Sequence, residues 1–197
     1  MGNVWIWIGL GVFITVLIIL VRIGLPVLKG WIGERMVRTV LKTLPADKYI
    51  VLNNVYFRRK RWSCQIDHLI ISPYGIFSIE TKNYRGVIEG NYTDKYLQRR
   101  VLWMKYKTYS PIYQNYRHLQ RLVEAFPLIE AKKNVLHSIV CFMPGGKIRI
   151  HGSGAAIICK LTSLRENLLS FDKVVISQAD CQAIAEAVRR ESRQRQN

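Results

Sequence analysis

The chain has 197 residues, and its 30 Lys and Arg residues outnumber 13 Asp and Glu residues, which gives a formal net charge of +17 at pH 7. This length is enough for one domain of ordinary size together with an appended segment. The positive excess favours a polyanionic partner, either nucleic acid or an anionic membrane surface. The four cysteines show no Cys-x-x-Cys spacing, which argues against a zinc ribbon or a disulfide framework.

The first segment is apolar. No charged residue occurs from Val4 to Val21, and a helix of that length spans about 27 Å, close to the ~30 Å hydrocarbon core of a bilayer. Trp5 and Trp7 suit the headgroup level. A signal peptide would have a basic start and a small-x-small cleavage site, and a buried core helix would have a polar face. This segment shows none of these features. We therefore predict a transmembrane anchor over residues 1–28, with lipid contact through residues 4–28.

The flanking charges predict the orientation of this anchor. No Lys or Arg precedes the apolar run, whereas Arg22, Lys29, Arg35 and Arg38 follow it. Positive charge is retained on the cytoplasmic side of a membrane. The expected protein is single-pass, with its C-terminal domain in the cytoplasm.

After the anchor, helical and extended patterns alternate, and this order predicts an α/β domain over residues 29–185. We expect a central mixed β-sheet flanked by helices, followed by a basic polar tail over residues 186–197. The expected helices cover residues 30–44, 111–126 and 163–169 and a last stretch from residue 177, and the expected strands cover residues 49–57, 63–71, 76–82, 86–92, 96–103, 135–142 and 155–159.

The second and third strands form a hairpin with a distinctive polar face. The turn Ser72-Pro73-Tyr74-Gly75 separates them, and pairing of the flanking isoleucines would place Asp67 opposite Glu80, with Cβ atoms roughly 4.5–5.5 Å apart. Lys82 lies two residues further on and projects on the same face. Two carboxylates repel each other unless a cation or a proton lies between them, so the pattern predicts a metal site beside an ammonium group. The simpler alternative is a cross-strand salt bridge from Asp67 to Lys82, with Glu80 solvated.

Several motifs follow one another along the chain: Gly33-Glu34, Gln65-Ile66-Asp67-His68, Pro73-Tyr74-Gly75-Ile76-Phe77, Glu80-Thr81-Lys82-Asn83-Tyr84, Gly86 and Pro111-Ile112-Tyr113-Gln114-Asn115. Together and in this order they resemble the nuclease-related domain (NERD) family, which is similar to the PD-(D/E)XK, or restriction-endonuclease-like, superfamily. The resemblance implies a restriction-endonuclease-like fold and hydrolysis of phosphodiester bonds in DNA or RNA.

The resemblance also implies roles for individual residues. Asp67, Glu80 and the Thr81 carbonyl would ligate Mg2+ or Mn2+, and Lys82 would position the attacking water or stabilise the transition state. The chemistry of these residues agrees with the implied roles. Mg2+ prefers oxygen ligands, and the compact positive charge of Lys82 suits the negative charge that develops on the phosphoryl group. Glu34 would add to the metal shell, and Gln114 would orient the water, Lys82 or the phosphate.

The histidines do not have metal-ligand spacing. His118 lies four residues after Gln114, on the same helix face, and is expected to be a structural partner or a phosphate contact. His68 should point to the face opposite Asp67 and be structural.

Basic and aromatic residues interleave in the middle of the chain, a pattern suited to stacking on bases and tracking a phosphate backbone. The alternative is strand packing with a solvated basic face. The predicted nucleic-acid-binding residues are Arg58, Arg59, Lys60, Arg61, Arg85, Arg99, Arg100, Lys105, Lys107 and Arg117.

Together these features predict a membrane-anchored, metal-dependent nuclease that acts on nucleic acid, with DNA as the expected substrate. A catalytically silent nucleic-acid-binding or membrane-surface module on the same fold is the alternative.

Overall fold

The computed structural model describes residues 2–193. Residues 194–197 of the predicted tail lie outside the described residues. The helices are α1 (Gly2–Leu41), α2 (Pro111–Ala125), α3 (Pro127–Glu130), α4 (Leu161–Leu169) and α5 (Gln178–Arg193), with a 3-10 turn at Lys133–Val135. The strands are β1 (Ile50–Arg59), β2 (Trp62–Ser72), β3 (Gly75–Lys82), β4 (Gly86–Asn91), β5 (Tyr96–Val101), β6 (Met104–Tyr109), β7 (Leu136–Phe142), β8 (Gly146–His151) and β9 (Ile157–Lys160).

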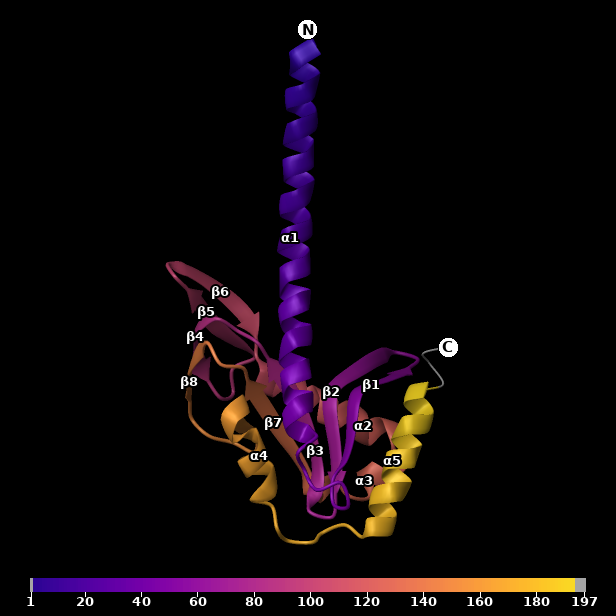
Figure 1. Ribbon diagram of the computed structural model, residues 1–197. Helices are drawn as coiled ribbons and strands as arrows, with labels where there is room; N and C mark the ends of the chain where they lie inside the picture. Colours follow the sequence, from indigo (N-terminus) through magenta and orange to yellow (C-terminus); the bar gives the residue numbers. More distant parts are fainter. Residues whose placement is uncertain (1, 194–197) are drawn as a thin grey trace.

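The strands form two sheets, with the orders β1-β2-β3-β7-β9 and β6-β5-β4-β8 (Figure 1). Each sheet is mixed, because β3 pairs with β7 and β4 with β8 in parallel while the hairpin pairs are antiparallel. The α/β class and the predicted mixed sheet flanked by helices are confirmed, and a second sheet that was not predicted accompanies it. The chain passes between the sheets at Gly86, where φ is 87° and a side chain would collide with the Arg100 carbonyl.

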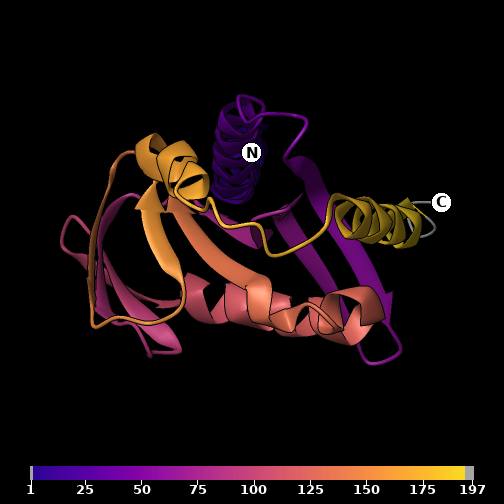
Figure 2. The ribbon, with the colours of Figure 1, turned by 90° about the horizontal axis from the view of Figure 1, so that it is seen from below.

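Helices cover both faces of the first sheet. Leu122 of α2 and Ile184 of α5 share one core cluster with Ile66, whereas Val37 of α1 and Leu164 of α4 share another with strands β3 and β7. Figure 2 shows α2 along one side of this sheet, with α1 and α4 on the other. This layering buries the strand residues from both sides and holds β2 and β3 in fixed positions.

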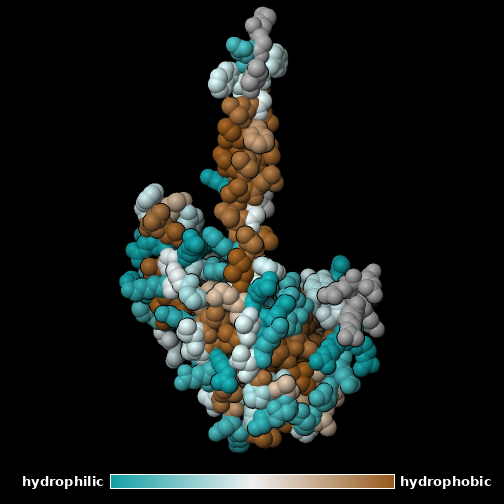
Figure 3. Space-filling model, in the orientation of Figure 1, coloured by the Kyte–Doolittle hydropathy of each residue, from teal (hydrophilic) through white to brown (hydrophobic). Residues whose placement is uncertain are grey.

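The helix α1 is one continuous element of 40 residues, so the predicted anchor and the predicted helix over residues 30–44 are joined. Its last turns pack into the domain, where Val37 and Leu41 are buried. Its earlier part projects from the domain with apolar side chains exposed (Figures 1 and 3). The helix from Trp7 to Leu41 is long and apolar enough to cross a membrane, and its apolar window is 0% buried. A signal sequence at an N-terminus would pass the same test of length and composition.

The second sheet differs most from the sequence prediction. The expected strand over residues 96–103 ends at Val101, because the chain turns at Leu102 and returns as β6. The strands β6 and β8 were not predicted. The β5–β6 turn was not recognised in the sequence because Leu102 and Trp103 provide neither Gly nor Asn. Strand β8 was not recognised because the short alternation of Ile148 and Ile150 follows a glycine pair that suggested a loop.

The last helix also extends further than expected, since α5 continues to Arg193. Val188 is buried, and Glu191 lies 2.6 Å from Arg59 at the tip of β1. Residues 186–193 are therefore helical, and Val188 and Glu191 lie against the domain rather than in a solvated tail.

Asn115 of α2 joins the helix to the first sheet. Its amide nitrogen donates to the Ser78 carbonyl at 2.8 Å, to the Ser138 hydroxyl at 2.9 Å and to the Ile139 carbonyl at 3.1 Å, and its oxygen accepts from the Ser78 hydroxyl at 2.6 Å. The side chain is fully buried, so these bonds compensate the loss of its contact with water. The network fixes α2 over β3 and β7, and thereby the place of the preceding Gln114.

Candidate active site

The β2–β3 hairpin has the predicted register. Ile71 pairs with Ile76, and the ladder runs to the pair His68 and Ile79. Just beyond it, the Thr81 backbone amide donates to the Asp67 carboxylate at 2.8 Å. Asp67 and Glu80, which come next after the last pair of the ladder, both line one pocket. His68 is buried away from it and contacts Asn53 at 2.7 Å.

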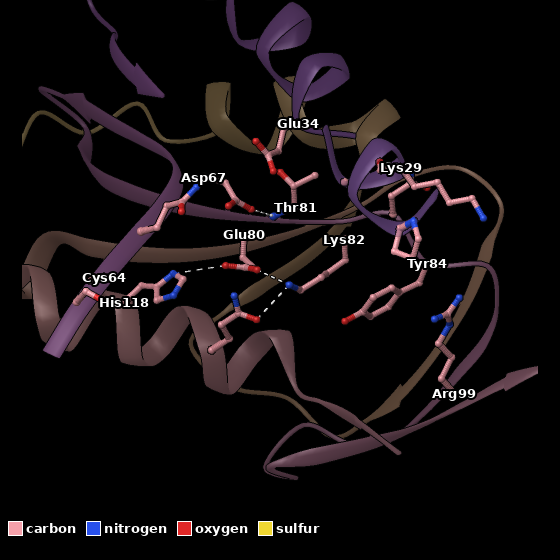
Figure 4. A pocket seen from close by; sticks show the side chains of 16 residues that line it. Lys29, Glu34, Cys64, Asp67, Glu80, Thr81, Lys82, Tyr84, Arg99 and His118 are labelled. Carbon is pink, nitrogen blue, oxygen red and sulfur yellow. Dashed lines mark hydrogen bonds and ion pairs between the residues drawn. The ribbon is translucent and has the colours of Figure 1, made fainter. Parts of the chain in front are cut away.

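The pocket has a volume of about 600 Å3 and lies where four parts of the fold meet (Figure 4). Strands β2 and β3 form its base. One wall comes from the part of α1 that includes Pro26, Lys29 and Glu34, and another comes from Gln114 and His118 of α2. Tyr84, just after β3, and Arg99 of β5 close a further side.

Glu80 is the most deeply buried acid of the pocket, with 1% of its surface exposed. The Lys82 ammonium lies 2.5 Å from one of its oxygens and donates to the Gln114 side-chain oxygen at 3.1 Å. Burial raises the pKa of Glu80 to about 7, with Asp67 and Glu34 adding to the rise and Lys82 opposing it. Lys82 is therefore paired with Glu80 and Gln114, which contradicts the simple Asp67–Lys82 salt bridge with a solvated Glu80.

Two further carboxylates stand in this pocket. Burial raises the pKa of Asp67 despite the opposing Thr81 hydrogen bond and Lys82 charge, and burial with the nearby Asp67 charge raises the pKa of Glu34. The three raised pKa values show that burial disfavours the charged form of each acid in the absence of a cation. Such clusters are typical of functional sites.

The position of Glu34 depends on the residue before it. A side chain at Gly33 would lie 3.3 Å from both Asn83 and Met143, so a glycine allows α1 to approach β3 closely. The Asn83 side chain also donates to the Lys29 carbonyl at 2.8 Å. These two contacts bring the Glu34 carboxylate to the pocket.

His118 was not among the predicted catalytic residues, yet it lines the pocket. Its Nδ1 lies 3.4 Å from the second oxygen of Glu80. Burial, together with the Lys82 charge, lowers the pKa of His118 to about 4, so the imidazole is neutral near pH 7. The signal was present in the sequence, because His118 follows Gln114 by one helical turn.

The donor set suits a hard divalent cation. Asp67 and Glu80 offer carboxylate oxygens, and one Glu80 oxygen is buried without a hydrogen-bond partner. Within residues 2–193, no group of three or more His, Cys, Asp or Glu side chains is arranged to hold a metal ion. Mg2+ commonly takes one or two carboxylates and completes its shell with water and phosphate oxygens, so the residues fit that ion.

The ten predicted nucleic-acid-binding cations are all described, and they do not form one surface. Arg99 lines the pocket, stacks on Tyr84 with 5.0 Å between the guanidinium carbon and the ring centre, and donates to the Arg85 carbonyl. Arg59 is partly buried and contacts Glu191 and the Ala125 carbonyl. The other cations are exposed: Arg58, Lys60 and Arg61 at the β1–β2 tip, Arg85 before β4, Arg100, Lys105 and Lys107 on β5 and β6, and Arg117 on α2.

Comparison with known proteins gives one family and one relative. Residues 29–143 match the family described as NERD, nuclease-related domain. An uncharacterized protein of Bacillus anthracis is 35% identical over 98 residues, which cover 49% of this chain and 46% of that protein. The match thus spans about half the length of that relative. No solved structure matches the chain.

Proposed function

The chain belongs to the nuclease-related domain family, and on this premise we propose that it is a membrane-anchored nuclease that hydrolyses phosphodiester bonds with a divalent metal ion. The observation that carries the proposal is the convergence of Asp67, Glu80 and Lys82 in one pocket. Two acids on adjacent strands, with a lysine two residues after the second, are the elements of a PD-(D/E)XK-type site. The proposed substrate is nucleic acid, with DNA favoured over RNA.

Asp67, Glu80 and the Thr81 carbonyl would hold Mg2+ or Mn2+, and Glu34 would add to the metal shell. When bound, such an ion supplies a more acidic water and neutralises phosphoryl oxygens. Lys82 places an ammonium group beside this position, and its bond to Gln114 fixes the direction of that group. A fixed cation in a partly buried pocket stabilises charge that develops in the transition state.

His118 and Arg99 complete the proposed machinery. The neutral imidazole of His118 lies beside Glu80 and offers that carboxyl group a hydrogen-bond partner, and Arg99 stands on the second sheet at the edge of the pocket, where a phosphate next to the scissile one would pass. The Arg99 guanidinium is held by Tyr84 and the Arg85 carbonyl. It therefore loses little freedom when it binds a phosphate.

We further propose that residues 4–28 of α1 cross the bilayer and that the domain lies on the cytoplasmic side. The exposed apolar surface of the helix and the cations that follow it support this placement.

The direct test is a cleavage assay with the purified full chain in detergent. We expect plasmid or oligonucleotide DNA to be cut in the presence of Mg2+, and EDTA to stop cutting until Mg2+ is added again. A substrate panel that includes RNA would define the substrate. Cleavage that continues unchanged in EDTA would contradict metal dependence, and DNA and RNA binding without any cleavage would favour the silent module.

The raised pKa of Glu80 predicts that metal binding and stability depend on pH in opposite ways. Without metal, the folded chain holds a proton on Glu80 up to about pH 7, whereas the unfolded chain releases it near 4.5. Stability should therefore fall as pH rises through this window. Added Mg2+ competes with that proton, so its stabilising effect should grow with pH. Melting temperatures with and without Mg2+ from pH 5.5 to 8 would measure this, and a Mg2+ effect independent of pH would contradict it.

A further inference from the structure

The tip of the β5–β6 hairpin exposes large apolar side chains. Leu102 is 78% exposed, Trp103 83% and Met104 47%. They are contiguous in sequence and lie outside the three core clusters of the described residues. An apolar patch of this kind on a protruding element indicates a contact with an apolar partner.

The backbone of this tip is also unusual for a water-exposed turn. Val101 pairs with Met104, so Leu102 and Trp103 are the two turn residues, and Leu102 has a φ of 55°. A two-residue hairpin turn with positive φ at its first position is normally occupied by glycine or asparagine. The hairpin would close more easily with such residues. Leu and Trp at these positions therefore point to a role for their side chains outside the fold.

Cations surround the apolar tip. From Tyr96 to Tyr109 the hairpin carries Arg99, Arg100, Lys105 and Lys107 and no acidic residue, and Arg100 contacts Glu89 of the neighbouring strand β4 at 3.1 Å. Apolar side chains bordered by Lys and Arg are the composition of elements that insert into the headgroup region of an anionic bilayer. Tryptophan is also favoured at that level.

The direction of the hairpin agrees with this chemistry. It rises from the domain on the same side as α1, and its tip reaches the level of the apolar part of that helix (Figure 1). In Figure 3 the brown tip and the brown part of α1 stand above the mostly hydrophilic surface of the domain. A bilayer crossed by α1 would therefore meet the hairpin as well.

We propose that the β5–β6 tip is a second membrane contact, in which Leu102, Trp103 and Met104 enter the headgroup region of the bilayer and the flanking cations bind anionic lipid headgroups. This inference rests on the proposed anchor. It assigns the exposed cations of this hairpin to lipid rather than to nucleic acid. Arg99, at the base of the hairpin, remains in the pocket wall.

The test places a fluorescent probe on the tip of the full chain, reconstituted in vesicles of phosphatidylcholine and phosphatidylglycerol. Trp103→Cys and Lys105→Cys each carry an environment-sensitive fluorophore, and the second variant keeps Trp103. Val174→Cys is the matched control, because Val174 is 67% exposed in the α4–α5 connection at the far end of the domain in Figure 1. The four native cysteines are buried. Lipids with a spin label near the headgroup should quench both tip probes several-fold more than the control.

A turn replacement separates insertion from surface attraction. Leu102→Gly with Trp103→Asn provides residues that suit the turn, so the hairpin should remain folded. We expect this pair to abolish lipid quenching at the Lys105→Cys probe. Quenching that persists in the pair, or equal quenching at the tip and at Val174→Cys, would overturn the proposal.

Other occupants and failure of the anchor give distinct results. A tip probe that responds to an oligonucleotide but not to lipid would assign the hairpin to nucleic acid and overturn the proposal. A tip probe whose exposure to water decreases in detergent as the protein concentration rises would assign the hairpin tip to contact with a second copy of the chain, and would likewise overturn the proposal. If α1 is not an anchor, the chain will leave the vesicles at high salt. Cosedimentation measures this loss separately from the probe fluorescence. The readout does not require cleavage, so loss of the nuclease proposal would also be seen separately.

Discussion

Replacing Lys82 with methionine should lower the rate of phosphodiester cleavage by about 100- to 1,000-fold, which is the usual effect of removing one charge-stabilising group from an active site. Methionine keeps most of the volume of the lysine stem, so the fold should be retained. The partner left behind is Glu80, whose pKa is already raised to about 7. Without the ammonium nearby, this acid can hold a proton instead of remaining as an unpaired buried charge.

The measurement is the initial rate of plasmid or oligonucleotide cleavage in Mg2+ for the variant and the wild-type chain. Asp67→Asn should produce a comparable loss, because it removes a charged ligand while preserving the shape of the side chain. Glu166→Gln is the matched control, since Glu166 is an exposed acid on α4 outside the pocket. Wild-type rates for Lys82→Met or Asp67→Asn would refute the catalytic assignment.

Removing residues 1–28 should remove the proposed membrane anchor and leave a soluble domain. The deleted segment includes 13 Val, Ile, Leu and Phe residues between Val4 and Val21. At roughly 0.3 to 0.6 kcal/mol each, their insertion into a bilayer contributes about 4–8 kcal/mol. That energy corresponds to a change in membrane partition of about three to six orders of magnitude.

The shortened chain should still fold, because the part of α1 that packs on the sheet follows the deletion. Val37 and Leu41 are among its buried residues. Cosedimentation with vesicles at high salt and circular dichroism of the soluble fraction would check both expectations. The proposed hairpin contact should then give only weak, salt-sensitive binding to anionic vesicles. Vesicle binding by the shortened chain that resists high salt would show that residues 1–28 are not the main anchor.

The sequence was most informative where chemistry and register coincide. The turn between β2 and β3 and the strand patterns on either side set the pairing of Ile71 with Ile76, and this register placed Asp67 and Glu80 in one pocket. Glu34 of the motif Gly33-Glu34 also lines the pocket, where a glycine allows the helix to approach Asn83 and Met143 closely.

Other features depend on contacts that a sequence pattern does not reveal. Strands β6 and β8 of the second sheet were missed because the Leu102–Trp103 turn lacks Gly and Asn and because β8 follows a glycine pair that suggested a loop. Arg99 could not be singled out among ten cations, since only the packing of β5 against Tyr84 brings it to the pocket. His118 shares a helix face with Gln114, but the sequence does not show that it approaches Glu80. That approach depends on the position of α2 on the sheet, which the hydrogen bonds of Asn115 fix.

The unbroken course of α1 determines where the chemistry can take place. Glu34 is six residues beyond residue 28, which corresponds to about 9 Å along a helix axis. On the proposed placement of α1 in the bilayer, a continuous helix of that length, in place of a flexible tether, keeps the pocket close to the membrane surface. Nucleic acid that reaches the membrane would then lie within range of the pocket.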